Sequence, residues 1–326
     1  MNRTMKAAVI REAGGPDVLK LERLPVPTPK RGEVLIRVKA FGLNRSELFT
    51  RQGHSPNVQF PRVLGIEATG LVEAAPGGEF EPGDVVATAM GGLGRAFDGS
   101  YAEYTLVPVS QVKKLDTRLA WEVLGAIPEM LPTAWGSLFK SLRLQEGDTI
   151  LIRGGTTSVG LAAAALAKRH GAVVAATTRD PAREETLRRN GADQVFIDNG
   201  ALAPQIREVF PCGVNKVLEL IGTNTLLDSL QSARAGGVVC MTGMVGNSWS
   251  LADFSPMSAI PTAVNLTTYA GGSEDFMRTP LQDFVELIEA GEYSPHIGKT
   301  FSLDEIVEAH RCMERNQAGG KIVVLA

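Results

Sequence analysis

The feature that most restricts the fold is an alternation of short apolar segments and helix-length segments that begins near residue 148. Periodicity predicts helices over 161–170 and 181–190, the second opened by Pro181 in its first turn. The apolar segments have the length of buried strands and read, in chain order, TILIRG, AVVAATT, QVFID, KVLELIG and GVVCMTG. Repeated βα units of this kind predict a doubly wound parallel sheet with helices on both faces.

The first third of the chain has a different pattern, a run of strands without helical spacing. These segments are rich in β-branched or aromatic residues and are bounded by Gly, Pro or Asp, which favours a partly open β-barrel: MKAAVI, EVLIRVKAFGL, ATGLVEAA, DVVATA and SYAEYTLV. After about residue 264 the pattern is mixed, with amphipathic helices expected near 281–290 and 303–316. The last strand, KIVVL, has no place in a completed parallel sheet, so we expect it to return to the N-terminal domain. The expected domains are therefore 1–124 with 265–326, and 125–264.

Composition excludes several classes of protein. The formal net charge of −3 over 326 residues gives no basic field for nucleic acid or an anionic membrane, so neither is an expected partner. The three cysteines are well separated and form no CxxC pair, which argues against a disulfide framework. Arg11 and Glu12 interrupt any secretory apolar region, and Lys168 and Arg169 interrupt the best candidate for a membrane span. The expected location is the cytoplasm.

The loop after the first strand of the βα repeat, GGTTSVG, resembles a dinucleotide-binding turn. Gly154 and Gly155 supply the tight turn and Gly160 the close packing of helix on strand, but Thr157 stands where such loops usually carry a glycine. A small-residue turn with no ligand is the alternative. If the loop binds a pyrophosphate, the residues expected to contact it are Gly155, Thr156, Thr157, Ser158 and Val159.

The end of the next strand indicates which dinucleotide is preferred. Sites for NADH usually have an Asp or Glu there to accept from the ribose 2′-hydroxyl. This chain has Thr178 and Arg179, with Arg183 one helical turn later, and guanidinium groups bind a 2′-phosphate bidentately. NADPH is the favoured cofactor; the alternative is that both arginines are solvated at the start of a surface helix.

Motifs along almost the whole chain resemble the medium-chain dehydrogenase/reductase superfamily, in particular its zinc-free quinone oxidoreductase (zeta-crystallin-like) branch. The matching segments besides the loop are MKAAVIREAGGPDVL, AFGLNRSELFTRQG, FPRVLGIEATGLV, PGDVVAT, DGSYAEY, GADQVFID and GGKIVV. The resemblance implies an α/β protein with a GroES-like, partly open β-barrel domain interrupted by a Rossmann domain. This agrees with the pattern of strands and helices described above.

The resemblance also bears on metal binding. The positions that hold the Cys, His and Cys ligands of catalytic zinc in related alcohol dehydrogenases correspond here to Asn44, Ile66 and Glu129. A catalytic zinc needs three protein ligands, and this set does not supply them, so we expect no metal. Hydride transfer to an ordinary ketone builds an alkoxide that needs a Lewis acid or a strong proton donor, whereas quinones and enones delocalise the charge. The expected acceptor is therefore a conjugated carbonyl compound.

By resemblance, Asn44 faces the nicotinamide and donates to a substrate oxygen, and Thr133 lies near the nicotinamide ribose. The alternatives are that Asn44 braces its own turn and that Thr133 bonds back to its helix. His54 is a candidate proton donor, although a solvated loop histidine is the simpler interpretation. Thr242 and Gly243 are expected to close over the nicotinamide, and Lys321 to reach a cofactor phosphate.

The leading functional hypothesis is an NADPH-dependent quinone reductase. The alternatives are a reductase of α,β-unsaturated carbonyls (enones, 2-alkenals or enoyl thioesters) and a non-catalytic NADPH-binding protein. The family also implies a homodimer formed through the edge of the Rossmann sheet, with which the strand-like segment NLTTYAGG is compatible.

Overall fold

The computed structural model describes residues 3–326, which divide into two compact units. One comprises the described residues up to Pro132 together with Gly271–Ala326, and the other comprises Thr133–Ala270. The sequence placed the boundaries earlier, at 124 and 265. Residues 265–270 stay with the second unit because strand β14 (Asn265–Thr268) pairs with β13 (Ala233–Met241).

The first unit is built mainly from strands. One sheet has the order β2-β1-β4, and a seven-stranded sheet has the order β15-β16-β3-β5-β6-β8, with β7 pairing with β3. The strands are β1 (Thr4–Ile10), β2 (Lys20–Pro25), β3 (Glu33–Gly42), β4 (Arg62–Val63), β5 (Glu67–Ala74), β6 (Val85–Ala89), β7 (Tyr104–Pro108), β8 (Val112–Lys114), β15 (Ile297–Ser302) and β16 (Lys321–Leu325).

The C-terminal strand returns to this unit, as the sequence predicts. β16 pairs antiparallel with β3, with Val323 opposite Gly42, and parallel with β15. Its residues Lys321, Ile322, Val323 and Val324 are all buried, which explains why an apolar strand at the end of the chain needs a place inside a sheet.

Short helices connect the strands of the first unit, and the boundary between the units falls within α3. The helical segments are η1 (Pro16–Val18), α1 (Arg45–Arg51), η2 (Val109–Gln111), α2 (Trp121–Leu124), α3 (Met130–Trp135), α9 (Ser273–Arg278), α10 (Leu281–Glu289), η5 (Leu303–Glu305) and α11 (Ile306–Glu314). α10 is amphipathic, as expected: Leu281, Phe284 and Val285 recur at helical spacing and are buried.

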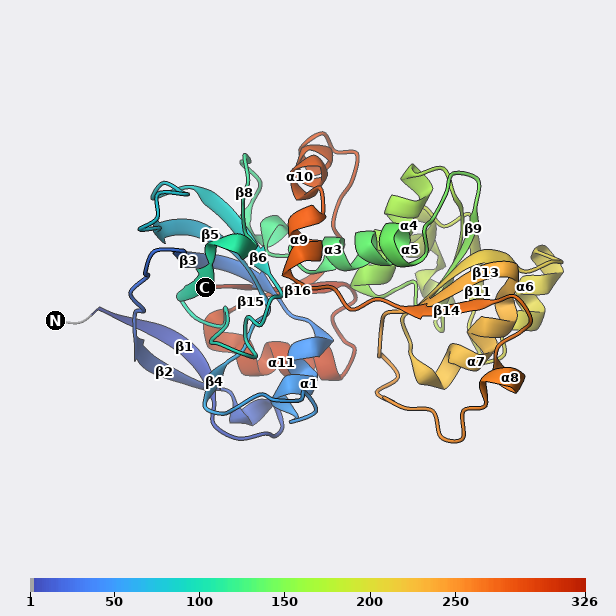
Figure 1. Ribbon diagram of the computed structural model, residues 1–326, viewed down its shortest axis with the longest axis horizontal. Helices are drawn as coiled ribbons and strands as arrows, with labels where there is room; N and C mark the ends of the chain where they lie inside the picture. The colour runs from blue at the N-terminus through green and yellow to red at the C-terminus, as the bar shows by residue number, and fades with distance from the viewer. Residues whose placement is uncertain (1–2) are drawn as a thin grey trace. The chain divides into compact units, whose positions relative to one another are not determined.

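The second unit contains a six-stranded sheet in which every pair is parallel, in the order β11-β10-β9-β12-β13-β14. In Figure 1, α4 and α5 lie on one side of this sheet and α6 and α7 on the other. The elements not yet given bounds are the π-helical segment η3 (Gly136–Ser141), β9 (Thr149–Arg153), α4 (Ser158–Arg169), β10 (Val173–Thr178), η4 (Pro181–Arg183), α5 (Glu184–Arg189), β11 (Gln194–Ile197), α6 (Ala203–Val209), β12 (Val214–Glu219), α7 (Thr223–Ser232) and α8 (Pro256–Ala259).

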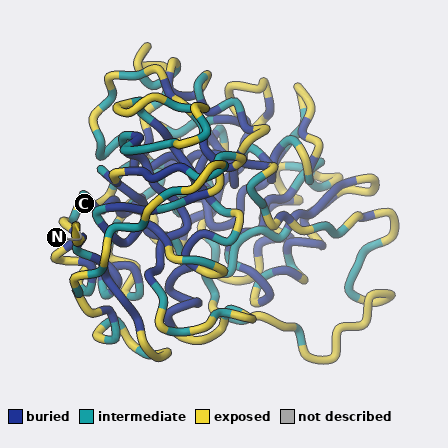
Figure 2. Tube along the Cα trace, turned by 60° about the vertical axis from the view of Figure 1, so that its left-hand side comes forward, coloured by how far each residue is buried: buried dark blue, intermediate teal, exposed yellow. Residues whose placement is uncertain are grey.

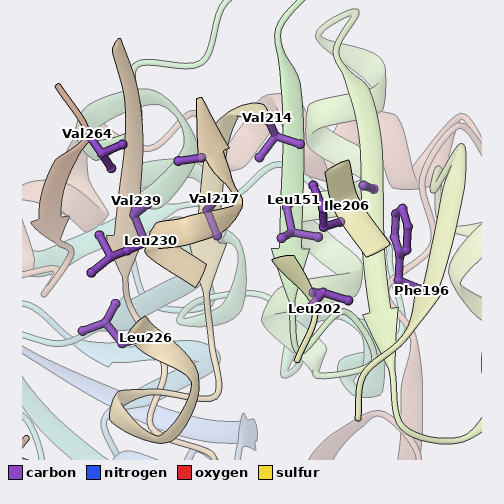
Figure 3. Close-up of a cluster of buried hydrophobic side chains, with 12 residues drawn as sticks. Leu151, Phe196, Leu202, Ile206, Val214, Val217, Leu226, Leu230, Val239 and Val264 are labelled. Atoms are coloured by element: carbon purple, nitrogen blue, oxygen red, sulfur yellow. The ribbon is translucent and has the colours of Figure 1, made fainter. Parts of the chain in front are cut away.

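The face of this sheet beneath α6 and α7 forms a continuous apolar core. Leu202 directly precedes α6 and Ile206 lies within it, while Leu226 and Leu230 come from α7 (Figure 3). They pack on strand residues that include Leu151, Val217 and Val239. Full burial of one such side chain is worth about 1.5–3 kcal/mol, so this layer fixes the strand ends that carry the loops.

Burial follows the strands in both units, and the connecting loops are mostly exposed (Figure 2). Among residues 3–326, no helix combines the length and the apolar character that crossing a bilayer requires.

Candidate functional site

The loop between β9 and α4 is a tight turn at the carboxyl end of the sheet. Gly154 has φ +86°, a left-handed conformation that favours glycine, and its N–H donates to Thr177 Oγ1 over 3.0 Å. Residues Thr156, Thr157, Ser158 and Val159 are only partly buried and lie at the N-terminus of the twelve-residue helix α4. The positive end of the helix dipole and the first backbone N–H groups make such a terminus suited to an anion.

Thr157 takes the place of the missing glycine as the N-cap of α4. Its hydroxyl accepts from the N–H of Gly160 at 2.9 Å and donates to the carbonyl of Gly154 at 2.8 Å. Gly160 has no room for a side chain, since a Cβ there would lie 2.5 Å from the oxygen of Gly154. The close packing of helix on strand is therefore kept, while the hydroxyl holds the turn that the middle glycine would otherwise leave flexible.

The end of β10 presents the residues expected to select the cofactor. The hydroxyl of Thr178 donates to the carbonyl of Asp180 and accepts from its N–H, which fixes the turn. Arg179 is exposed, and the Arg183 side chain is 39% exposed. Sequence reasoning missed Asp180: its carboxylate accepts from the N–H of Ala182 and lies 4.0 Å from Arg183 Nε, so it partly neutralises that guanidinium.

Thr133 and Thr242 are linked through a third hydroxyl that sequence reasoning did not identify. Ser137 Oγ donates its hydrogen to the carbonyl of Thr133 at 2.7 Å. Because that hydrogen is used, Thr242 Oγ1 is the donor in the 2.9 Å bond between the two hydroxyls. Thr242 and Gly243 both donate their N–H to the carbonyl of Glu219 at the end of β12. Cys240 is fully buried, and its Sγ lies 3.5 Å from Thr242 Oγ1, so it packs in the core beside this group of hydroxyls.

A buried arginine directly precedes the loop and was also missed. The guanidinium of Arg153 is forked onto Asp198, at 2.8 and 2.9 Å, and also bonds Asp228 at 2.7 Å. Its side chain is 0% exposed. These bonds tie the end of β9 to the residue after β11 and to α7. An arginine in the strand TILIRG, followed by aspartates after later strands, is the signal that could have revealed the network.

In the first unit, Asn44 belongs to a cluster of polar and charged groups around three buried ones, Glu47, Glu67 and Lys321. We call it the Glu67 cluster; its other members, Asn44 and Glu129, are half-buried. Asn44 Nδ2 donates to Glu67 Oε1 at 2.8 Å and to Glu47 Oε1 at 3.3 Å, and Asn44 Oδ1 accepts from Lys321 Nζ at 2.6 Å. Both hydrogens of the amide are therefore used inside the protein. This differs from the expectation that Asn44 donates to substrate and is close to the alternative that it braces the local backbone.

Lys321 has a role that the sequence did not indicate. Its Nζ lies 2.8 Å from Glu67 Oε1, and the two side chains are 1% and 0% exposed. Burial alone would lower the pKa of Lys321, but the charges of Glu67 and Glu129 outweigh it and raise the pKa. The ammonium therefore binds the Glu67 carboxylate and not, as expected, a cofactor phosphate. β16 and β5 lie on either side of β3 in one sheet, and Gly42 of β3 has no side chain to block the lysine as it reaches across to Glu67.

Glu47 is the other buried carboxyl of the Glu67 cluster. Its Oε1 accepts from the N–H of Ile66 at 3.2 Å, while its Oε2 is buried without a hydrogen-bond partner. Burial, and secondly the negative charge of Glu67, raises the pKa of Glu47 to about 8. Glu47 is therefore mostly a neutral acid at pH 7, while Glu67 is paired with the ammonium. By contrast, His54 is exposed after α1, and its backbone N–H donates to the carbonyl of Phe49.

Two family models match the chain. The "Alcohol dehydrogenase GroES-like domain" matches residues 30–117, and the "Zinc-binding dehydrogenase" matches residues 190–324. The zinc in the second description does not fit the residues present. Ile66 offers a hydrocarbon side chain, the amide oxygen of Asn44 is bonded to an ammonium, and among residues 3–326 no group of three or more His, Cys, Asp or Glu could hold a metal ion.

Relatives match over almost the full length. A quinone oxidoreductase of Pongo abelii is 30% identical, with 99% of this chain and 98% of the relative covered. An acryloyl-coenzyme A reductase of Metallosphaera sedula is 26% identical, with coverage of 98% and 99%. A solved mycobacterial structure complexed with NADPH has a TM-score of 0.87 and 27% identity, covering 99% of this chain and 100% of that one. The chain is an oxidoreductase with a nicotinamide cofactor, and it belongs to the medium-chain dehydrogenase/reductase superfamily, in the branch of the quinone oxidoreductases.

Proposed function

We propose that the protein uses NADPH to reduce quinones by hydride transfer. The observation that carries this proposal is that Asn44 and Ile66 stand where related dehydrogenases have metal ligands, while the amide oxygen of Asn44 accepts from the Lys321 ammonium and Ile66 offers only hydrocarbon. Bound NADPH supplies the hydride. A quinone spreads the incoming negative charge into a phenolate, so its reduction needs hydrogen bonds and ordered water instead of a Lewis acid.

A second candidate acceptor is an α,β-unsaturated carbonyl compound. The 26% identity to an acryloyl-coenzyme A reductase favours it, and the chemistry is compatible, because hydride addition to an enone gives a delocalised enolate. The two are separated by steady-state oxidation of NADPH with 1,4-benzoquinone, a 2-alkenal and acryloyl-coenzyme A, and reduction of NADP+ with ethanol serves as the reverse control. We expect kcat/KM for the quinone to exceed the others. A higher value for an enone reverses the order, and tight NADPH binding with no turnover on any acceptor supports the non-catalytic alternative.

NADPH is proposed over NADH because of the charges that follow β10. Arg179 and Arg183 are exposed on the turn and on η4, where a 2′-phosphate can be bound bidentately. The double variant Arg179→Ala/Arg183→Ala is expected to raise KM for NADPH about tenfold or more and to leave KM for NADH nearly unchanged, since one charge-assisted hydrogen bond is worth about 1.5–3 kcal/mol. Arg189→Ala, which removes an exposed guanidinium of α5 paired with Glu185, is the matched control. Equal changes for both cofactors would contradict the assignment.

The remaining cofactor contacts are proposed from the same unit. Gly155, Thr156, Thr157, Ser158 and Val159 are proposed to bind the pyrophosphate at the N-terminus of α4, and Thr178 to shape the ribose turn. Thr133, Thr242 and Gly243 are proposed to contact the nicotinamide half, with Ser137 holding the first two in place. His54 stays a proposed proton donor that no contact in the structure supports.

We also propose a homodimer in the cytoplasm. β14 ends the six-stranded sheet, and within residues 3–326 its outer edge pairs with no further strand, so a second copy could extend the sheet. Cys212, Cys240 and Cys312 are free thiols, as a reducing compartment favours. Light scattering after gel filtration should give twice the mass of 34.8 kDa, and a proline in place of Thr267 should shift it to the monomer.

A further inference from the structure

The three positions that correspond to the zinc ligands of related dehydrogenases, Asn44, Ile66 and Glu129, direct N–H groups to the same two carboxyl groups. Asn44 donates its amide hydrogens to Glu67 and Glu47, the N–H of Ile66 donates to Glu47, and the N–H of Glu129 donates to Glu67 Oε2 at 2.8 Å. All of these residues lie in the first unit. The two carboxyl groups at the centre of this oxygen-rich cluster are shielded from water, since Glu47 and Glu67 are 1% and 0% exposed, while Asn44 and Glu129 are half-buried.

The cluster already contains one cation. Lys321 Nζ lies 2.6 Å from Asn44 Oδ1 and 2.8 Å from Glu67 Oε1, distances typical of charge-assisted bonds. Gly42 makes room for it, because a Cβ at that position would lie 2.3 Å from Lys321 Cε and 2.5 Å from Glu67 Oε1. A buried carboxylate without such a partner would pay a desolvation cost of several kcal/mol.

One oxygen of the cluster remains unused. Glu47 Oε2 is buried and has no hydrogen-bond partner. If the ammonium were removed, Glu67 Oε1 and Asn44 Oδ1 would each lose a partner. A divalent cation bound there in its place would also displace the proton that neutral Glu47 holds. Carboxylate and amide oxygens, completed by water, are what hard divalent cations such as Mn²⁺ prefer.

We propose that the Lys321 ammonium is the resident cation of the Glu67 cluster and excludes divalent metal ions from it, and that its removal converts the cluster into a divalent-cation site. This inference goes beyond the proposed function, because it concerns which cation the first unit holds and not which acceptor is reduced. Its tests measure stability and bound metal, so failure of the acceptor assignment leaves them unaffected.

The experiment compares the full-length wild type with Lys321→Met, an uncharged residue of similar length. Thermal unfolding is followed with and without millimolar Mn²⁺, and bound manganese is measured after gel filtration. We expect Lys321→Met to melt below the wild type, to regain part of the loss in Mn²⁺ and to retain about one Mn²⁺ per chain. The wild type is expected to show neither the shift nor the metal.

Two controls separate this from general effects. The double variant Lys321→Met/Glu67→Gln removes both charges and should fold near the wild-type Tm without responding to Mn²⁺. Lys168→Met frees an exposed carboxylate, that of Asp193, and should not respond either. The proposal is overturned if the wild type binds Mn²⁺ in a manner that Glu67→Gln abolishes, or if folded Lys321→Met ignores the metal. It is equally overturned if Lys321→Met stays unfolded in Mn²⁺ while the double variant folds.

Discussion

Lys321 Nζ and Glu67 Oε1 lie 2.8 Å apart, although 254 residues separate them and neither side chain is more than 1% exposed. The pair spans three neighbouring strands, from β16 over β3 to β5. A buried ion pair of this kind specifies which strands are neighbours, because either charge alone would be left in a low-dielectric interior.

Removing one charge of this pair should lower the free energy of unfolding much more than removing both charges together. Lys321→Met and Glu67→Gln are each expected to lower the free energy of unfolding by about 3–5 kcal/mol, whereas the double variant should lie much closer to the wild type. Urea unfolding of the four proteins gives the coupling energy directly. Additive losses would mean that the two charges do not depend on each other.

The cap of α4 can be tested at Thr157. Thr157→Val keeps the shape but loses the hydroxyl that bonds Gly154 and Gly160, so it should cost about 1 kcal/mol of stability. Thr157→Ser should be nearly neutral, and Thr157→Gly should cost only a few tenths of a kcal/mol. Thermal unfolding ranks the three variants, and a loss in Thr157→Ser as large as that in Thr157→Val would exclude the hydroxyl as the cause.

The bidentate bonds of Arg153 allow the contribution of its guanidinium geometry to stability to be separated from that of its charge. Arg153→Lys keeps the positive charge but cannot bond both oxygens of Asp198 and also reach Asp228, so the free energy of unfolding should fall by about 1–3 kcal/mol. Arg153→Met should cost more, about 3–5 kcal/mol, since it leaves carboxylates without their partner. Chemical denaturation distinguishes the two, and a lysine variant as stable as the wild type would show that charge alone suffices.

Much of the fold followed from local pattern. The parallel strands of the second unit recur with helices between them, and the isolated segment KIVVL had to return to the other sheet because it is too apolar to remain at a surface. The boundary near 265 was placed too early because a four-residue segment, NLTT, carries too little periodicity to show that it pairs with β13.

The candidate site was less accessible to sequence reasoning. The loop residues around Thr157 are contiguous, so their grouping at one helix N-terminus could be predicted from spacing. Asn44 and Lys321 are 277 residues apart, and their contact depends on the register of β16 against β3, which no local pattern encodes. Asp180 and Ser137 were missed because polar residues in turns and helices have many common roles besides ligand binding.

Glu47 makes the stability of the protein depend on pH. Its pKa rises from the ordinary 4.5 to about 8, mainly because of burial and then because of Glu67, so the folded state holds this proton more tightly than the unfolded chain does. For a raised pKa, the stabilising contribution is fully present below pH 4.5, declines as the pH rises and is lost above about pH 8. One pKa unit corresponds to about 1.36 kcal/mol, so the rise from 4.5 to about 8 amounts to roughly 5 kcal/mol.

Glu47→Gln should remove this dependence, because an amide does not ionise. Between about pH 5 and pH 9 the free energy of unfolding of the wild type should fall more steeply than that of Glu47→Gln. The variant should therefore become more stable relative to the wild type as the pH rises. The amide brings donors to a place where Glu47 Oε2 has no partner, so a constant loss at all pH values is also expected. Urea unfolding across this pH range measures both effects, with Glu79→Gln, an exposed carboxyl, as the control that keeps the wild-type slope. Parallel curves for the wild type and Glu47→Gln would mean that the buried carboxyl does not titrate in this interval, and the neutral acid assigned to the Glu67 cluster would have to be abandoned.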